Sequence, residues 1–595
     1  MLPLKILSNI PLPKVPAAET VHFGECRVRP LSQQRNGPEY ERRSMQEILA
    51  QVPNGFSPDV LLFRSPEYLP IPDDIHLFRG SKVLVITDWN VSLRFLPELC
   101  QQFDLCFTDA PGVRILRKAG VQNIYHQLLY GFNPSSFHYL NLNRDLDLSF
   151  CGNINASLHR ERNRLLFRLA HWGQNRTIHL GQAFGKKYEQ ILNRSRLVFN
   201  YSVRGEANMR LYEAMACGAV VLVEKTNEEV PLIFKDGIHY IAYEPKDLES
   251  VCNALLKDPD RLESIGREAQ KAVQAQTQAC QFSSLVTQIQ NLSSGAGFEH
   301  SHSHPRSGKS TSALKKMRLL GMGYTIHEAI QEVESRQIDD PDFAAETLPS
   351  LITCEENSLQ DAYRKAQVEG MLENPIIPRH FAEWIKMVWA IGNEQWLEAQ
   401  TYAEKGLEKL EALVSLSPNM DPGYGLFYPP LQLGHPLNGD LNFCFREYLE
   451  LGNHSAYVNL MKNLKLSGAA IACMQLEKDE DSLNFALKMN AGRWTGVSPW
   501  PVIFTLCLTG ENDRNILEEV VQSWLQDSPL DIKSWDQILR GLRTGRQWEL
   551  YAKFASAIQP VAQQFFTQEK WESLFPVGQI QKTVERNVDP IRTVI

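Results

Sequence analysis

The sequence predicts two consecutive α/β domains with parallel sheets, followed by an all-α helical region. Between Lys82 and Tyr243, short β-branched and apolar runs alternate with helix-compatible stretches, which is the pattern of βαβ units. A glycine and proline turn at residues 130–134 interrupts the series. Beyond residue 312, strand signals nearly vanish and helical periodicity continues to the C-terminus.

Eight strands are expected, at residues 83–87, 105–108, 124–129, 146–151, 177–180, 197–201, 220–224 and 240–243. Parallel strands that are covered on both faces should be continuously apolar, as Val83 to Ile86 and Ala219 to Val223 are. We therefore predict a first domain at residues 1–138, whose proline-rich start we cannot assign. A second domain of five strands follows at residues 139–292, and two charged helices at 246–257 and 260–276 close it.

The serine- and glycine-rich segment 293–312 has too few apolar residues to order itself and is predicted to be a flexible linker. The helical domain then spans residues 313–595. Three of its segments, at 390–407, 475–487 and 508–517, each combine a tight polar turn with a following helix. They resemble the helix-turn-helix of tetratricopeptide repeats, although only the second and third lie near the expected period of about 34 residues. A plain helical bundle is the alternative.

Composition limits the functional classes. At 595 residues the chain needs several cores, and 43% hydrophobic with 22% charged residues is typical of a folded soluble protein. A net charge of -8 gives no global basic field, so nucleic acid is not an expected partner. The eleven cysteines include no C-x-x-C pair and are predicted to be buried thiols in a reducing compartment. With no signal peptide and no apolar run of about 18 residues, we expect a cytoplasmic protein without a transmembrane segment.

One helix, expected to begin after Asn208 and end before Gly218, carries the clearest chemical signal. Asparagine is a favoured N-cap, and glycine suits the left-handed position after a helix. The helix should start at the carboxyl edge of a parallel sheet, where its free amides and dipole favour a diphosphate. Arg210 adds a cation in the first turn, and Glu213 can accept hydrogen bonds from the two ribose hydroxyls.

The alternative for Arg210 and Glu213 is a surface ion pair between residues three positions apart. Against it, the apolar run from Ala214 to Val223 indicates a helix that is buried on most sides. A buried carboxylate requires a partner or a function. We therefore prefer the ligand-binding interpretation, more strongly for Glu213 than for Arg210.

The segment Asn208-x-Arg210-x-Tyr212-Glu213-Ala214-x-Ala216-Cys217-Gly218-Ala219 resembles the donor-binding signature of group 1 glycosyltransferases, in particular the CgeB-like (spore maturation protein B-like) branch. Two upstream segments agree with it. Leu148 to Asn153, followed by an arginine-led helix at 160–166, is similar to the first strand, glycine turn and helix of that branch's donor domain. Leu129 to Pro134 with Phe137 is similar to its interdomain hinge.

This resemblance covers about residues 83–272 and implies a GT-B fold of two Rossmann-like domains. It implies that the second domain holds a nucleoside-diphosphate sugar as donor substrate, with Glu213 on the ribose. Gly152 and Asn153 would lie near the phosphates and sugar, and Arg162 and Arg210 would contact the diphosphate. We expect neither a metal ion nor a further cofactor. The acceptor would be a protein or a polysaccharide (a surface polymer), which the helical domain would recruit.

The chain also departs from the family pattern. Retaining members of the wider group carry a second glutamate eight positions before the ribose-binding one, but Gly205 stands there in this chain. An inverting enzyme would need a base from the first domain, and Asp88 and Asp109 each follow a predicted strand. An aspartate after a strand is more often a cap or turn residue. A catalytically inactive GT-B scaffold is therefore the rival hypothesis.

Three other sequence signals and one other function are set aside. Asp145-Leu146-Asp147 matches the metal-binding D-x-D of another glycosyltransferase fold only briefly. Gly308 to Thr311 resembles the end of a phosphate-binding loop without its first glycine or a preceding strand, and the alternating histidines at 300–304 lie in the predicted linker. An oxidoreductase or epimerase is disfavoured because no G-x-G-x-x-G follows an early strand.

Overall fold

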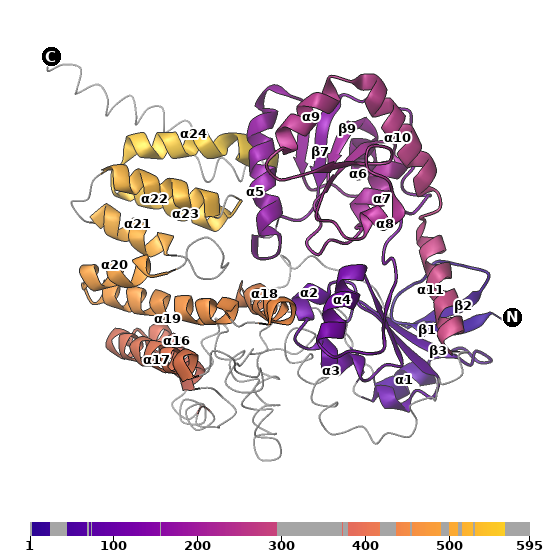
Figure 1. The fold of residues 1–595 in the computed structure, drawn as a ribbon, viewed down its shortest axis with the longest axis horizontal. Coiled ribbons are helices and arrows are strands. Elements are labelled where there is room, and N and C mark those ends of the chain that lie inside the picture. Colours follow the sequence, from indigo (N-terminus) through magenta and orange to yellow (C-terminus); the bar gives the residue numbers. More distant parts are fainter. Residues whose placement is uncertain are drawn as a thin grey trace. The chain divides into compact units, whose positions relative to one another are not determined.

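The computed structural model describes residues 3–23, 44–67, 71–72, 74–154, 156–293, 372, 379–416, 436–452, 455–489, 499–509, 514–527 and 530–565 (Figure 1). They form two compact units, Met1–Gly131 with Gln276–Ala472, and Phe132–Ala275 with Cys473–Ile595. Each unit contains one parallel sheet and part of the helical region. The predicted fold class, two Rossmann-like domains of the GT-B type followed by an all-α region, is confirmed.

The first sheet has six parallel strands in the order β2-β1-β3-β4-β5-β6. They are β1 (Leu4–Ser8), β2 (Ala18–His22), β3 (Val60–Arg64), β4 (Ser81–Val85), β5 (Leu105–Thr108) and β6 (Ile124–His126). The first three strands lie in the segment that the sequence left unassigned. The residues of β2 are half-buried or exposed, so this strand has no apolar face that the sequence could reveal. The prolines on either side of β1 obscured the apolar pattern of that strand.

Side chains of the first sheet alternate between two apolar layers. On β4, Leu84 faces the layer formed with α1 (Met45–Ala50), α2 (Trp89–Ser92), α3 (Leu96–Cys100) and α4 (Ala110–Lys118). Val83 and Val85 face the opposite layer, which contains Phe282 and Val286 of α11 (Gln278–Ser293). The chain therefore returns to the first sheet after leaving the second. The predicted second domain, in contrast, ran to residue 292.

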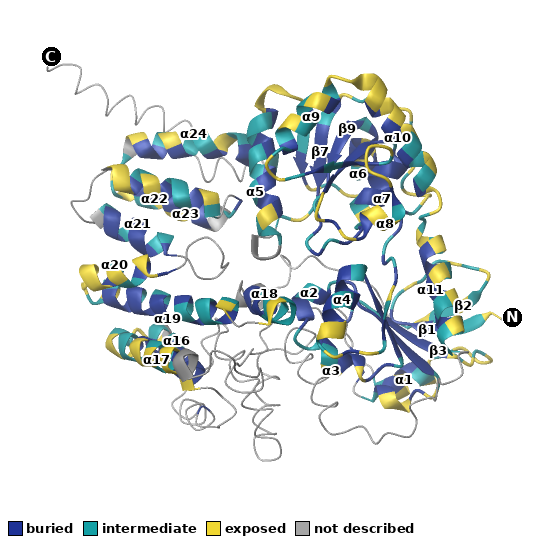
Figure 2. Ribbon diagram, viewed as in Figure 1, coloured by how far each residue is buried: buried dark blue, intermediate teal, exposed yellow. Residues whose placement is uncertain are grey.

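The second sheet has five parallel strands in the order β11-β10-β9-β7-β8. They are β7 (Leu146–Cys151), β8 (Ile178–Gly181), β9 (Ser195–Phe199), β10 (Val220–Glu224) and β11 (Ile241–Tyr243). Its helices are α5 (Ala156–Trp172), α6 (Gly185–Arg194), α7 (Met209–Ala216), α8 (Val230–Ile233), α9 (Leu248–Leu256) and α10 (Pro259–Val273). The five strands predicted for this domain are all present. The sheets of both units are buried along most of their length (Figure 2).

The helical region is divided between the units. The first contains α16 (Arg379–Gly392), α17 (Trp396–Leu416), α18 (Pro436–Leu451) and most of α19 (Ser455–Gln475). The second contains α20 (Asp479–Leu487), α21 (Trp500–Thr509), α22 (Arg514–Asp527), α23 (Ile532–Thr544) and α24 (Trp548–Phe565). Within the first unit α18 packs on the Rossmann part, where Arg114 pairs with Glu450 at 2.7 Å. Within the second, His171 of α5 bonds the carbonyl of Ala557 on α24 at 2.8 Å.

Three turns between these helices share one geometry. Glu394, Glu477 and Arg546 each have a φ between 56° and 58°, in the left-handed region. In each turn the next residue's N–H bonds the carbonyl five positions back, as in a Schellman motif. Two of these turns belong to predicted segments, and the turn at residue 546 was not predicted. Residues 510–513, the turn of the third predicted segment, lie outside the described residues, as does the predicted linker.

Two composition-based expectations bear on the described residues. The described cysteines are free and, except for Cys280, buried, in agreement with the expected buried thiols. Within the described part of the chain, no helix combines the length and the apolar character needed to cross a bilayer.

Candidate functional site

Both predicted caps of α7 are confirmed. The Asn208 side chain accepts a hydrogen bond from the Leu211 backbone N–H at 3.4 Å, and Gly218 adopts a φ of 75° after the helix end. The helix is buried from Leu211 to Ala216. Because this helix follows β9, its positive end lies at the carboxyl edge of the second sheet. The edge therefore offers the unpaired amides that an anion requires.

The strand order places a switch point between β7 and β9, because the chain leaves these neighbouring strands in opposite directions along the sheet. Arg210 spans this point. Its Nε donates to the carbonyl oxygen of Cys151, the last residue of β7, at 2.9 Å. Its Nη1 donates to Oδ1 of Asn200, which follows β9, at 2.9 Å. These two bonds hold the guanidinium in place where open α/β sheets bind ligands.

The third nitrogen of this guanidinium, Nη2, makes no hydrogen bond with the described part of the chain. Gly152 leaves space beside it, since a Cβ atom at this position would lie 2.5 Å from Nη2 and 2.9 Å from Cζ of Phe150. The arrangement leaves one face of the cation available to a ligand. It also explains why a glycine follows β7: a side chain at position 152 would collide with Arg210.

A second cation, Arg162 of α5, lies against the same aromatic ring. The guanidinium carbons of Arg210 and Arg162 are 4.4 Å and 5.3 Å from the centre of the Phe150 ring. Burial, followed by the charge of Arg210, lowers the pKa of Arg162 to about 9. Burial and then the charges of Arg162 and Arg210 lower the pKa of His159 to about 2. Two guanidinium groups and a neutral histidine are thus close together, with the carboxylates of Glu206 and Glu224 near Arg162 and that of Glu213 near Arg210.

Several polar atoms of this cluster are buried and lack a hydrogen-bond partner in the described structure. They are Nε of Arg162, Nδ1 of His159 and Nδ2 of Asn200. Two of these atoms are certain donors, and a buried donor without a partner costs free energy. Another nitrogen of Arg162, Nη2, donates to the backbone carbonyl of Asn153, whose residue is exposed. Buried donors without partners beside two guanidinium groups are a setting that favours an anion.

Glu213 lies one turn inside α7 and is only 5% exposed. Its Oε2 accepts a hydrogen bond from the hydroxyl of Tyr188, on α6, at 2.9 Å. Burial raises the pKa of Glu213, while Tyr188 and Arg210 lower it in part. Among the described residues, Arg210 and Glu213 do not form an ion pair, so the surface-pair alternative is wrong. The sequence did not indicate Tyr188, which holds the carboxylate from another helix.

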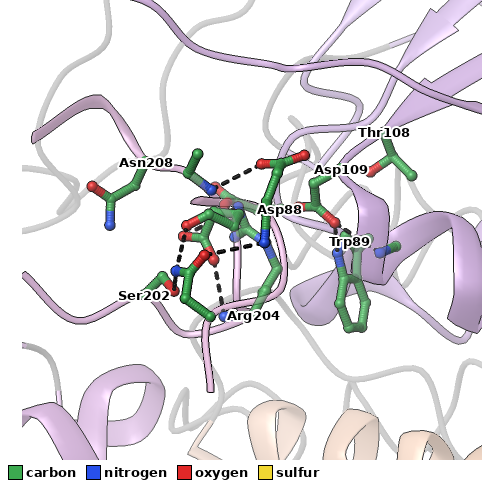
Figure 3. A network of polar contacts seen from close by, with 12 residues as sticks. Asp88, Trp89, Thr108, Asp109, Ser202, Arg204 and Asn208 are labelled. Carbon is green, nitrogen blue, oxygen red and sulfur yellow. Dashed lines mark hydrogen bonds and ion pairs between the residues drawn. The ribbon is translucent and has the colours of Figure 1, made fainter. Parts of the chain in front are cut away.

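The two candidate bases, Asp88 and Asp109, lie in the first unit and differ in their burial and in their hydrogen bonds. Asp109 is fully buried, caps α4 by accepting the Gly112 N–H at 2.7 Å, and accepts from Trp89 Nε1 at 2.8 Å (Figure 3). This is the cap role that competes with catalysis at such positions. Asp88 is half-buried, and its backbone N–H donates to Glu67 at 2.8 Å. The carboxylate of Asp109 therefore has a structural role as a helix cap.

Glu67 was missed because it follows β3, a strand that the sequence did not reveal. It is fully buried, and burial with the nearby charge of Asp88 raises its pKa to about 7. Glu224 at the end of β10 was also missed, because it ends an apolar run and resembles a solvent-facing strand end. It is buried, and burial raises its pKa to about 7.

Both aspartates of the D-x-D segment form ion pairs with arginines. Asp145 pairs with Arg194 at 2.6 Å and Asp147 with Arg196 at 3.0 Å, both near the surface. Each aspartate of this segment is thus the partner of an arginine. The phosphate-loop-like segment 308–311 and the histidines at 300–304 lie outside the described residues.

The part of the chain that holds this site matches a known protein family. Residues 141–281 match the family model described as glycosyl transferase-like. This part of the chain is therefore similar to that family. It contains β7 to β11 and α7, and therefore the whole anion site. No curated protein matches the chain.

Solved structures with a similar arrangement include HepE of Anabaena in complex with UDP and glucose, at 14% identity and a TM-score of 0.32, covering 39% of this chain and 78% of that one. Sucrose-phosphate synthase of Thermosynechococcus elongatus matches at 12% identity and a TM-score of 0.33, covering 48% and 89%. The pneumococcal O-GlcNAc transferase GtfA in complex with UDP and GlcNAc matches at 9% identity and a TM-score of 0.31, covering 40% and 57%.

Proposed function

We propose that this protein is a glycosyltransferase whose second domain binds a nucleoside-diphosphate sugar. The observation that carries the proposal is the position of Arg210 at the switch point, fixed by two hydrogen bonds and with Nη2 directed at no described protein acceptor. A guanidinium held in this way can donate to diphosphate oxygens without losing further side-chain freedom. The family match over residues 141–281 supports the same chemistry.

In this proposal each predicted site residue has a role. Arg210 and Arg162 bind the diphosphate together with the amides that Asn208 leaves free at the start of α7. Gly152 keeps space for the phosphates, and Asn153 lies at the exposed rim of the cluster. Glu213 accepts hydrogen bonds from the ribose, with Tyr188 fixing the orientation of its carboxylate.

The transfer requires an acceptor hydroxyl oxygen to form a bond with the anomeric carbon. The bond from that carbon to the diphosphate oxygen breaks, and the diphosphate leaves with the electron pair. We propose Asp88 or Asp109 of the first domain as the group that takes the hydroxyl proton. The reaction needs no metal ion or further cofactor if the arginines and the helix dipole stabilise the leaving group.

We further propose that the protein resembles the CgeB-like branch and that its helical region recruits a protein or surface-polymer acceptor. The repeated Schellman turns at Glu394, Glu477 and Arg546 support a tandem helical hairpin organisation. Glu477 and Arg546 lie 69 positions apart, about two tetratricopeptide periods of roughly 34 residues.

The first experiment is to titrate the full chain with UDP, GDP and ADP by calorimetry and then to measure hydrolysis of the matching sugar nucleotide. An active transferase should bind one of these nucleotides and should slowly hydrolyse the corresponding sugar nucleotide. An inactive scaffold should show no turnover. If no nucleoside diphosphate or sugar nucleotide binds, the proposed function is wrong.

Glu213→Gln should weaken binding of the preferred nucleoside diphosphate by about 10-fold, because a charged acceptor of two ribose hydrogen bonds is lost. Inorganic pyrophosphate has no ribose, so its affinity should be the same in the variant and the wild type. Calorimetry with both ligands measures the difference. If the affinities for both ligands fell equally, Glu213 would instead support the structure of the phosphate-binding part of the site.

Gly152→Ala should also weaken the nucleotide, by about 10-fold or more, since the new methyl group would lie 2.5 Å from Nη2 of Arg210. The guanidinium cannot withdraw without losing its bonds to Cys151 and Asn200. Here the affinity for pyrophosphate should fall as well. Gly237→Ala is the control for general backbone strain, because a methyl group there would meet no atom within 4 Å although the φ is 75°.

A further inference from the structure

The loop between β9 and α7 is tied to the segment that follows β10 by a buried polar network. Glu224 accepts from the Ser202 backbone N–H at 3.0 Å and from the Ser202 hydroxyl, and Asn227 Nδ2 donates to Glu224 at 2.9 Å. Asn227 also donates to the carbonyl of Glu206 at 3.1 Å. Ser202 and Arg204 of this loop are labelled in Figure 3. The network sets the path of the chain into the N-terminus of α7.

All of these hydrogen bonds to Glu224 reach one of its oxygens. They converge on Oε1, whereas Oε2 is buried and has no hydrogen-bond partner in the described structure. The residue is only 3% exposed. A buried carboxylate with one unsatisfied oxygen is costly while it is charged, and a proton removes that cost. In agreement, burial raises the pKa of Glu224 to about 7.

The groups that face Glu224 come from four elements. Arg162 of α5 supplies a positive charge, and the phenols of Tyr201 in the loop and Tyr243 on β11 interact with the same carboxylate. Ser202 and Asn227 supply the neutral hydrogen bonds. The pKa of Tyr201 is raised to about 12 and that of Tyr243 lies well above its usual value, mainly through burial, so both stay neutral near pH 7.

Arg162 therefore connects Glu224 to the candidate anion site, because it and Arg210 both lie against the Phe150 ring and both Arg210 and Glu224 interact electrostatically with it. A diphosphate bound at this pair adds negative charge and competes for the charge of Arg162. We propose that Glu224 is a positioning residue of the donor site that takes up one proton from solvent when the diphosphate binds, while it continues to hold the β9–α7 loop. This inference rests on the proposed nucleotide-sugar function.

Binding should cause proton uptake and not release, because a ligand that binds more tightly to the protonated form of Glu224 raises the pKa of this carboxyl. Above about pH 7 Glu224 is mostly ionised before binding, so binding should be accompanied by measurable proton uptake near pH 8. Near pH 5.5 the group already carries its proton and uptake should be close to none. Affinity should correspondingly increase as the pH falls from 8 toward 6.

The test is calorimetric titration of the full chain with UDP-glucose in two buffers of different ionisation enthalpy. UDP-glucose is chosen because its diphosphate, esterified at both ends, does not titrate in this range. Wild type should show the uptake described above, and Glu224→Gln should lose it while still binding. Glu229→Gln is the matched control, because Glu229 is also buried and accepts the Ala207 N–H of the same loop at 2.8 Å. It should keep the uptake.

The outcomes are separable. If UDP-glucose binds but wild type takes up no proton at any pH, or if Glu224→Gln takes up as much as wild type, the inference is overturned and the proposed function stands. If no binding occurs, the proposed function fails and the inference fails with it. Should Glu224→Gln not fold, an absence of proton uptake in the wild-type pH series still overturns the inference.

Discussion

Arg210→Met is expected to weaken binding of the preferred nucleoside diphosphate by about 10- to 100-fold, and to reduce sugar-nucleotide hydrolysis accordingly. The variant removes a fixed cation whose charge-assisted hydrogen bonds to phosphate are each worth on the order of 1.5–3 kcal/mol. Pyrophosphate should lose affinity by a similar factor, in contrast to the behaviour expected of Glu213→Gln. Calorimetry with both ligands provides the measurement.

Arg196→Met is the matched control for this variant. Arg196 lies on β9 of the same domain but pairs with Asp147 near the surface, far along the strand from the carboxyl edge. Its replacement should leave the affinity within about twofold, since exposed ion pairs contribute little. A melting curve for each variant checks that the fold is retained. Unchanged affinity in a folded Arg210→Met protein would exclude the proposed diphosphate site.

Lys465→Met is expected to stabilise the protein, by on the order of 2–4 kcal/mol near pH 6. Lys465 of α19 is fully buried, and its ammonium donates only to the Met461 carbonyl at 3.2 Å among the described residues. Burial lowers its pKa to about 7. Methionine has a similar length and carries no charge, so the variant avoids the cost of desolvating an ammonium.

The pH dependence of this effect follows from the lowered pKa. Between about pH 7 and the ordinary lysine pKa of 10.5, the unfolded chain binds the proton that the folded chain releases, so wild-type stability rises with pH across this window. The gain from Lys465→Met should be largest below pH 7 and shrink toward pH 10. Thermal melts of both proteins at several pH values measure it.

Lys409→Met provides the comparison on a neighbouring helix. Lys409 of α17 pairs with the buried Glu383, so its removal leaves a carboxylate without its counter-charge and should destabilise the protein. A lower melting temperature for Lys465→Met at every pH would instead show that the buried ammonium stabilises the fold.

The sequence predicted the donor-side helix well because its information is local. Asn208 and Gly218 mark the two ends of α7 through backbone rules that need no knowledge of the rest of the chain. The strands of the second sheet were equally predictable, since both of their faces are covered and their residues are mostly apolar. In the first domain, prolines around β1 and the polar character of β2 obscured these two strands, whereas β3 is a buried apolar run, Val60–Arg64, that was not predicted.

By itself the sequence determined the fold class, the capped helix and the residue types available for binding a diphosphate. Only the tertiary structure decided which of those residues act together: Arg210 joins β7 to β9, Phe150 brings Arg162 beside it, and Tyr188 reaches Glu213 from α6. It also showed that Asp109 caps α4 and revealed the buried carboxylate of Glu224. Caps and periodicity depend on neighbours along the chain, whereas burial, charge and hydrogen bonding at the site depend on residues that are distant in sequence and adjacent only in the folded protein.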